Sequence, residues 1–185
     1  MEVRWEGKRA EQRSYLSEIL DIANGTGRRL SAILGLTYDD LLLDVEPYGA
    51  IRWPAETDKI GRETIVPVSP AVRAALEHAI AERPGIGKTP IFPSPTDRQA
   101  PMSRHLADAW LREAEKKAKL TPQEGSLWHA YRRKWATERK HLPATDVAEA
   151  GGWAGPETLQ RVYQQPDPET MLAVVLGGGE LREVK

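Results

Sequence analysis

Apolar residues recur at helical spacing along most of the chain. Between Glu11 and Ala23, for example, Tyr15, Ile19 and Ile22 fall on one side of a helix. The same pattern, with serine or proline at several starts, predicts helices over residues 11–23, 26–34, 69–82, 103–119, 127–141, 145–150, 156–163 and 168–176. We therefore expect a mainly helical protein.

Short stretches of apolar and β-branched residues interrupt this pattern once. They cover residues 41–45, 50–53 and 63–68, with turn-forming residues at 47–49 and 59–62 between them. This arrangement predicts a small three-stranded antiparallel sheet. Residues 84–101 hold five prolines and two glycines, which predicts a loop. The expected fold class is α+β, mainly helical, with residues 1–176 as a single domain and residues 177–185 as a flexible tail.

Composition narrows the chemistry. The chain has 185 residues, is 40% apolar and 29% charged, and contains no cysteine, so disulfides and thiolate chemistry are excluded. Its four histidines lack a metal-ligand spacing, and we expect neither a metal nor another cofactor. No run of about eighteen apolar residues occurs, and no signal peptide precedes the first helix, so we expect a cytoplasmic protein without a membrane span.

Charge alone does not indicate a nucleic-acid partner, because the formal net charge is −1. Basic residues are nevertheless concentrated between residues 132 and 140, where Glu138 is the single acid. Arg133, Lys134 and Arg139 from this run are candidate DNA-binding residues. A solvated helix face would explain the same run, and the charge pattern leaves both interpretations open.

Four separated segments carry the candidate chemistry. The first is Thr26-Gly27-Arg28-Arg29, where an arginine stands at the start of a predicted helix. A guanidinium stays charged and offers two parallel donors, which suits a phosphate. We expect the neighbouring Arg28 to face elsewhere.

The remaining segments lie in the second half of the chain. His129 and Arg132 are three residues apart, which places them on one face of a helix. Trp153 follows two glycines, and Tyr163 stands at the end of a short predicted helix. Two arginines, a histidine, an indole and a late tyrosine are the groups that nucleophilic attack on a DNA phosphodiester would need.

In this order the segments resemble tyrosine recombinases and phage integrases, from about Glu11 to Met171. The resemblance also covers residues 59–67, which match the recombinase β-hairpin. It implies the fold of the recombinase catalytic domain and double-stranded DNA as partner. It implies the following roles: Arg29 and Arg132 clamp the scissile phosphate, Lys59 protonates the leaving oxygen, His129 assists proton transfer, Trp153 donates its indole N–H to the phosphate, and Tyr163 is the nucleophile that forms a 3′-phosphotyrosyl bond.

Two departures from the family pattern keep an alternative open. Ala32 stands where the family usually carries Glu or Asp. We also expect this chain to lack the helical core-binding domain that usually precedes the catalytic domain. The alternative is a catalytically weakened or inactive relative that acts as a DNA-binding or interaction module. Family members also assemble as tetramers that exchange a C-terminal segment. Residues 171–176 are the candidate for that segment, and packing against their own domain is the other possibility.

Overall fold

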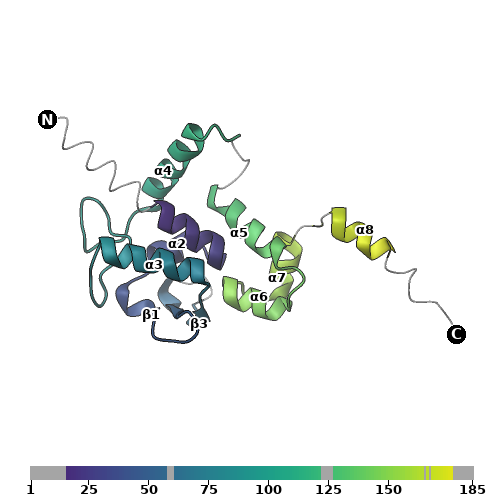
Figure 1. Ribbon diagram of the computed structural model, residues 1–185, viewed down its shortest axis with the longest axis horizontal. Coiled ribbons are helices and arrows are strands. Elements are labelled where there is room, and N and C mark those ends of the chain that lie inside the picture. The colour runs from purple at the N-terminus through teal and green to yellow at the C-terminus, as the bar shows by residue number, and fades with distance from the viewer. Residues whose placement is uncertain (1–15, 58–60, 122–126, 165, 167, 177–185) are drawn as a thin grey trace.

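The computed structural model describes residues 16–57, 61–121, 127–164, 166 and 168–176 (Figure 1). Residues 16–26 form the first described helix, and α2 (Leu30–Leu34) follows after three residues without regular structure. The predicted helix start at Thr26 is wrong, because Thr26 ends the preceding helix. Its hydroxyl donates to the carbonyl of Ile22, and Gly27 then takes a positive φ of 64° that stops the helix.

The predicted three-stranded antiparallel sheet is present, in the order β1 (Leu41–Leu42), β2 (Ala50–Trp53), β3 (Thr64–Pro67). Ile51 at the centre of β2 pairs with Leu41 on one side and with Val66 on the other. Strand β1 is shorter than the predicted 41–45, because Val45 N–H turns back to the carbonyl of Leu42. Two single turns, η1 (Tyr38–Asp40) and η2 (Ala55–Thr57), flank the sheet.

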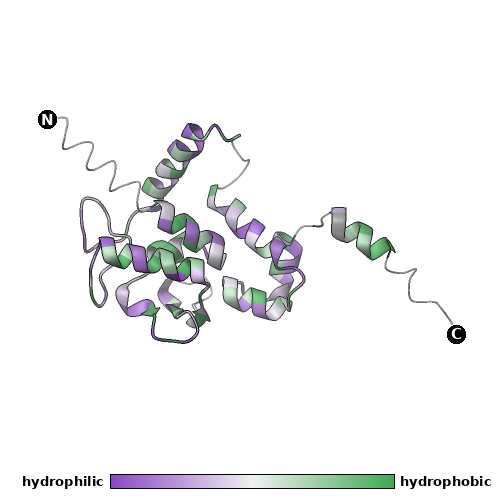
Figure 2. Cartoon of the chain, viewed as in Figure 1, coloured by the Kyte–Doolittle hydropathy of each residue, from purple (hydrophilic) through white to green (hydrophobic). Residues whose placement is uncertain are grey.

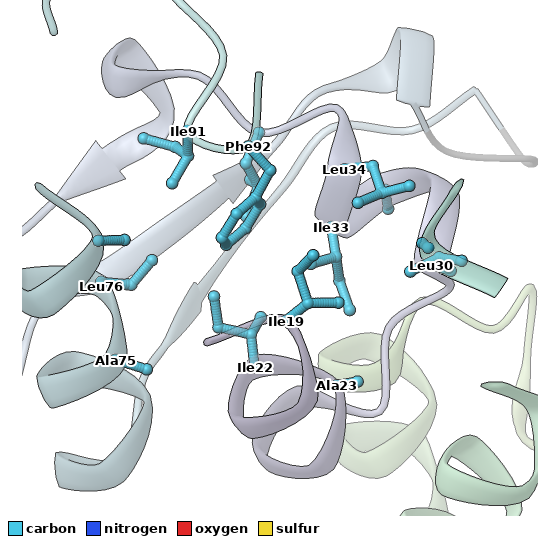
Figure 3. Packing of buried hydrophobic residues seen from close by; sticks show 14 of the residues in the cluster. Ile19, Ile22, Ala23, Leu30, Ile33, Leu34, Ala75, Leu76, Ile91 and Phe92 are labelled. Atoms are coloured by element: carbon cyan, nitrogen blue, oxygen red, sulfur yellow. The ribbon is translucent and has the colours of Figure 1, made fainter. Parts of the chain in front are cut away.

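The main core lies between the sheet and the first helices (Figure 3). Ile19 and Ile22 of the first helix meet Ile33 of α2 and Leu76 of α3 (Pro70–Glu82), and all four are fully buried. Phe92 from the proline-rich loop packs into the same core. Fully burying side chains of this kind contributes about 1.5–3 kcal/mol each, which explains why a short helix such as α2 is stable here.

The C-terminal helices form a second, smaller core. Helix α4 (Arg104–Lys117) packs against α2 and α5 (Leu127–Glu138), and α6 (Ala144–Gly151) follows. The next predicted helix, 156–163, is present as one turn of α7 (Pro156–Thr158) that continues into the π-helical η3 (Leu159–Tyr163). Helix α8 (Pro168–Leu176) comes last and extends away from the body of the molecule (Figure 1). The smaller core comprises Trp135, Ala136, Val147, Ala148, Trp153, Leu159 and Tyr163.

Several helix ends differ from the predicted ones by a few residues. Helix α5 ends at Glu138 rather than near His141, and α4 ends at Lys117 rather than at Lys119. Lys119 takes a positive φ of 54°, which ends regular helix just before it. The overall fold class, α+β and mainly helical with a small antiparallel sheet, is confirmed.

Candidate functional site

The site is built around the C-terminal end of α6. Gly152 follows the helix in the left-handed conformation, with φ 71° and ψ 48°. Its N–H reaches the carbonyl of Glu149, and the N–H of Trp153 reaches the carbonyl of Ala148 at 2.9 Å. This is a Schellman ending, and it leaves the carbonyls of Ala150, Gly151 and Gly152 without an intrahelical donor.

Arginine side chains from distant segments donate to those free carbonyls. Arg132 of α5 donates to the carbonyls of Gly27, Gly151 and Gly152, the last at 3.2 Å. Arg29, the N-cap residue of α2, donates to the carbonyl of Gly152 at 3.1 Å. The negative end of the α6 dipole thus faces two guanidinium groups, which offsets part of their mutual repulsion.

Glycines allow these segments to approach closely. A Cβ added to Gly27 would lie 2.5 Å from ring atoms of Trp135, and one added to Gly151 would lie 1.9 Å from the ring of Trp153. The two indoles stack on each other with centroids 5.9 Å apart. Gly27 and Gly151 therefore let the backbone lie directly on the indole faces. Arg132 lies between these two segments and donates to the carbonyl of each glycine.

Tyr163 lies beside these groups. Its ring centroid is 5.0 Å from that of Trp153, in an edge-on arrangement, and 5.2 Å from that of His129. The Cζ atom of Arg132 lies 5.4 Å from the Tyr163 centroid and 3.5 Å from the Trp153 centroid. Thr137 fixes the backbone at this point by donating to the carbonyl of Tyr163 at 3.1 Å. Histidine, tryptophan, tyrosine and both arginines of the predicted set therefore make one contiguous cluster, since Arg29 shares the Gly152 carbonyl with Arg132.

Burial differs strongly within this cluster. Arg132 is 2% exposed, Trp153 is 1% exposed and Tyr163 is 8% exposed, whereas Arg29 is half-buried and His129 is exposed. A phosphate approaching from solvent would thus meet Arg29 and His129 before the other three groups. The Nε1 atom of Trp153 is buried and has no hydrogen-bond partner among the described residues.

Burial, together with neighbouring positive charges, shifts two pKa values. Burial, followed by the charge of Arg29, lowers the pKa of Arg132 to about 9, and contact with Tyr163 opposes this change. Burial also lowers the pKa of His129 below its usual 6.5, with further contributions from Arg132, Arg133 and Arg29. At neutral pH Arg132 is therefore charged and His129 is mostly neutral, so that His129 can accept a proton.

The other predicted site residues lie apart from this cluster or outside the described chain. Lys59 lies outside the described residues. Arg133 and Lys134 are exposed on α5. Arg139, the residue after α5, folds back onto that helix. Its Cζ atom lies 4.4 Å from the Trp135 centroid, and its Nη1 donates to the Trp135 carbonyl at 3.1 Å.

Sequence reasoning missed the position of Arg28. Its side chain does not face elsewhere but is 5% exposed and donates to the carbonyls of Glu149 and Ala150 at the same helix end. The sequence carried only a weak signal for this position, namely a second arginine directly after Gly27. Ala32 lies in the main core and is 6% exposed.

Among the described residues, no cluster of three histidine, cysteine or acidic side chains is placed to hold a metal ion. No described helix has the length and apolar composition that crossing a bilayer requires.

Comparison with known proteins identifies relatives of the chain. The sequence model of the phage integrase family matches residues 7–170. No curated protein sequence matches the chain. Among solved structures, XerA recombinase aligns with a TM-score of 0.68 and 19% identity, covering 94% of this chain and 59% of that one.

Two further structures are similar. XerH site-specific recombinase, bound to a palindromic difH substrate after cleavage, aligns with a TM-score of 0.71 and 20% identity over 88% of this chain and 45% of that one. A lambda integrase dimer bound to a COC′ core site aligns with a TM-score of 0.60 and 17% identity over 83% and 55%, respectively. The chain thus spans about half the length of these structures, and the likeness shows a shared fold.

Proposed function

The chain belongs to the phage integrase family, and on this premise we propose that it is the catalytic domain of a tyrosine-type site-specific DNA recombinase. The observation that best supports the proposal is the contact of Tyr163 with His129, Trp153 and the Arg132 guanidinium. A phenol surrounded in this way has a base and a cationic field within reach. Its proposed partner is double-stranded DNA and its proposed compartment the cytoplasm.

The proposed reaction exchanges one phosphate ester bond for another, so it requires no external energy source. The phenol oxygen of Tyr163 attacks the phosphorus of one strand, and a phosphotyrosyl bond forms as the bond to the 5′ oxygen breaks. The phenol proton passes to His129, and the leaving 5′ oxygen takes up a proton, for which Lys59 is the candidate donor. Attack by the 5′ hydroxyl of a partner strand on the phosphotyrosyl bond reverses these steps and rejoins DNA.

The two arginines stabilise the transition state in this proposal. Arg29 is half-buried at the rim of the site and Arg132 lies behind it, and both already donate to the carbonyl of Gly152. A phosphate bound next to this carbonyl would be met by donors that are in place beforehand. Donors held in advance lower the barrier most, because they need little reorganisation during the reaction. Arg133, Lys134 and Arg139 are proposed to contact the DNA backbone outside the reacting phosphate.

One observation favours a second candidate, a module that binds DNA without cleaving it. Tyr163 is 8% exposed and Arg132 is 2% exposed, so both must become more accessible before a phosphate reaches them. If DNA does not induce that change, the chain binds without reacting.

The two candidates are separated by trapping the covalent product. The chain is mixed with nicked duplexes of randomised sequence in which the strand beyond the nick diffuses away after cleavage, and the mixture is denatured before electrophoresis. We expect a protein band shifted by covalently attached DNA. The Tyr163→Phe variant should give no shifted band and should bind duplex as the parent does. A complex visible in native gels without any adduct, even after fusion of a recombinase core-binding domain upstream, would favour the binding module.

We further propose that α8 mediates assembly of several copies, up to a tetramer, on DNA. The large apolar side chains of residues 171–176 are exposed by 52–78%, and Figure 2 shows that α8 is hydrophobic after its first turn and extends from the body. Such a surface usually has a partner. A groove beside it, lined by Thr137 and His141 of the α5 region and by Val174 and Val175 of α8, is the surface that an α8 from another copy would occupy.

Sedimentation velocity tests this assembly. We expect the chain to form oligomers with duplex DNA, and the double variant Val174→Glu, Val175→Glu to remain monomeric on DNA. Ile86→Glu is the matched control, since Ile86 is an equally exposed apolar residue (85%) far from α8 in the sequence. Oligomers that persist in the double variant would contradict the role of α8.

A further inference from the structure

The side chain of Arg28 joins the small sheet to the end of α6. Its Nε donates to the carbonyl of Ala150 at 2.8 Å, and its Nη2 donates to the carbonyl of Glu149 at 3.0 Å and to the hydroxyl of Thr64 at 2.7 Å. Trp53 of β2 lies under the guanidinium, with Cζ 4.9 Å from the ring centroid. Strands β2 and β3 and helix α6 are therefore connected through one buried side chain.

The α6 end is shaped around this guanidinium. A Cβ added to Gly152 would lie 2.5 Å from Nη1, 3.0 Å from Cζ and 3.2 Å from Cδ of Arg28. The backbone of Gly152 thus lies directly against Arg28, and the left-handed φ of 71° adds a second reason for glycine at this position. Displacing either group would displace the other.

Arg28 therefore completes the donor set of the helix end. The Schellman turn leaves three carbonyls free: that of Ala150 is taken by Arg28, and those of Gly151 and Gly152 are taken by Arg132 and Arg29. Because Arg28 holds the carbonyls immediately before the other two, it sets where those acceptors lie. An ion pair between Arg62, next to β3, and the Glu149 carboxylate reinforces the same connection.

We propose that Arg28 is a positioning residue for DNA cleavage, which fixes the α6–Gly152 turn so that Arg29, Arg132 and Trp153 stand correctly around Tyr163. This inference rests on the proposed function. Lysine cannot replace Arg28, because a single ammonium group cannot span the Thr64 hydroxyl and the carbonyls of two residues.

The test measures binding and chemistry separately. Arg28→Met keeps the length of the side chain and removes its donors. We expect an affinity for nicked duplex within about threefold of the parent, and a single-turnover rate of adduct formation at saturating DNA about 100-fold lower, the size of effect that a misplacement of about 1 Å produces. Arg28→Lys should be similarly slow.

Two further variants control for stability. Arg83→Met removes another buried arginine, which pairs with Glu18 at 2.9 Å on the far side of the main core, and should lower the melting temperature but leave the rate unchanged. Thr64→Val removes one partner of Arg28 and little else, and should slow adduct formation less than Arg28→Met does. All rates are measured well below the lowest melting temperature.

The outcomes distinguish the two proposals. Adduct formation at the parental rate in both Arg28→Met and Thr64→Val would overturn the role of Arg28 and leave the recombinase proposal intact. A rate loss in Arg83→Met equal to that in Arg28→Met would also overturn it, because general destabilisation would then explain the effect. If the parent gives no adduct even after fusion of a recombinase core-binding domain upstream, the recombinase proposal fails, and the catalytic role of Arg28 fails with it.

Discussion

Replacing Arg132 with lysine tests both the stability and the chemistry of the site. The guanidinium donates to the carbonyls of Gly27, Gly151 and Gly152, whereas an ammonium group at the same place can reach only one or two of these acceptors. Gly152 would keep its bond from Arg29. One or two buried carbonyls would therefore lose their donor.

The structure sets the expected magnitude. Each buried acceptor left without a partner costs about 1–3 kcal/mol, so the loss of one or two donors in Arg132→Lys should lower the free energy of unfolding by about 1–6 kcal/mol. For a domain of this size the melting temperature should fall by about 2–24 °C. Cleavage should fall by about 100-fold or more, because one of the two parallel donors to the phosphate is lost.

Differential scanning calorimetry and single-turnover adduct formation measure these two effects. The cleavage assay is run at least 15 °C below the melting temperature of the variant, so that unfolding does not contribute to the rate. A variant with the parental melting temperature would refute the three-carbonyl arrangement. A variant with the parental cleavage rate would refute the phosphate clamp.

Three further predictions concern pH, backbone and folding stability. Because the pKa of His129 is lowered below 6.5, its neutral form persists to lower pH, and the rate of adduct formation should decline only below pH 6.5. This decline at low pH should disappear in His129→Gln. A midpoint of the decline above pH 6.5 would count against His129 as the base. Gly27→Ala, which puts a Cβ 2.5 Å from the Trp135 ring at a positive φ, should cost about 2–5 kcal/mol in chemical denaturation, and a loss under 0.5 kcal/mol would contradict the close approach. Among the described residues, Arg83→Met leaves the buried carboxylate of Glu18 paired with His78 alone, and it should cost about 3–5 kcal/mol in the same assay, whereas parental stability would show that the pair is unimportant.

Much of the architecture could be predicted from the sequence, because its signals are local. The short stretches of apolar and β-branched residues around Ile51 and Val66, and the turn residues between them, are sufficient to predict the sheet. Ser69 and Ser103 mark helix starts, and both hydroxyls accept from a backbone N–H three residues later. Trp135, an aromatic residue within the predicted helix 127–141, is buried.

The differences arise where tertiary contacts decide. Thr26 has the signature of an N-cap, yet it ends the first helix, because the turn at Gly27 must bring backbone against Trp135. The turn that carries Tyr163 is π-helical, whereas its sequence predicted an ordinary helix. Arg28 could not be assigned from sequence, since its acceptors at Glu149 and Ala150 are more than 120 residues away.

The central claim is that Tyr163 forms the covalent bond to DNA, and mass spectrometry of the trapped adduct tests it most directly. The adduct is digested with protease and nuclease, and the peptide that carries a nucleotide is sequenced. We predict a single modified peptide with the nucleotide on Tyr163, joined through its 3′ phosphate, and a free 5′ hydroxyl on the released strand. A nucleotide on any other residue, or a 5′-linked nucleotide on Tyr163, would contradict the account.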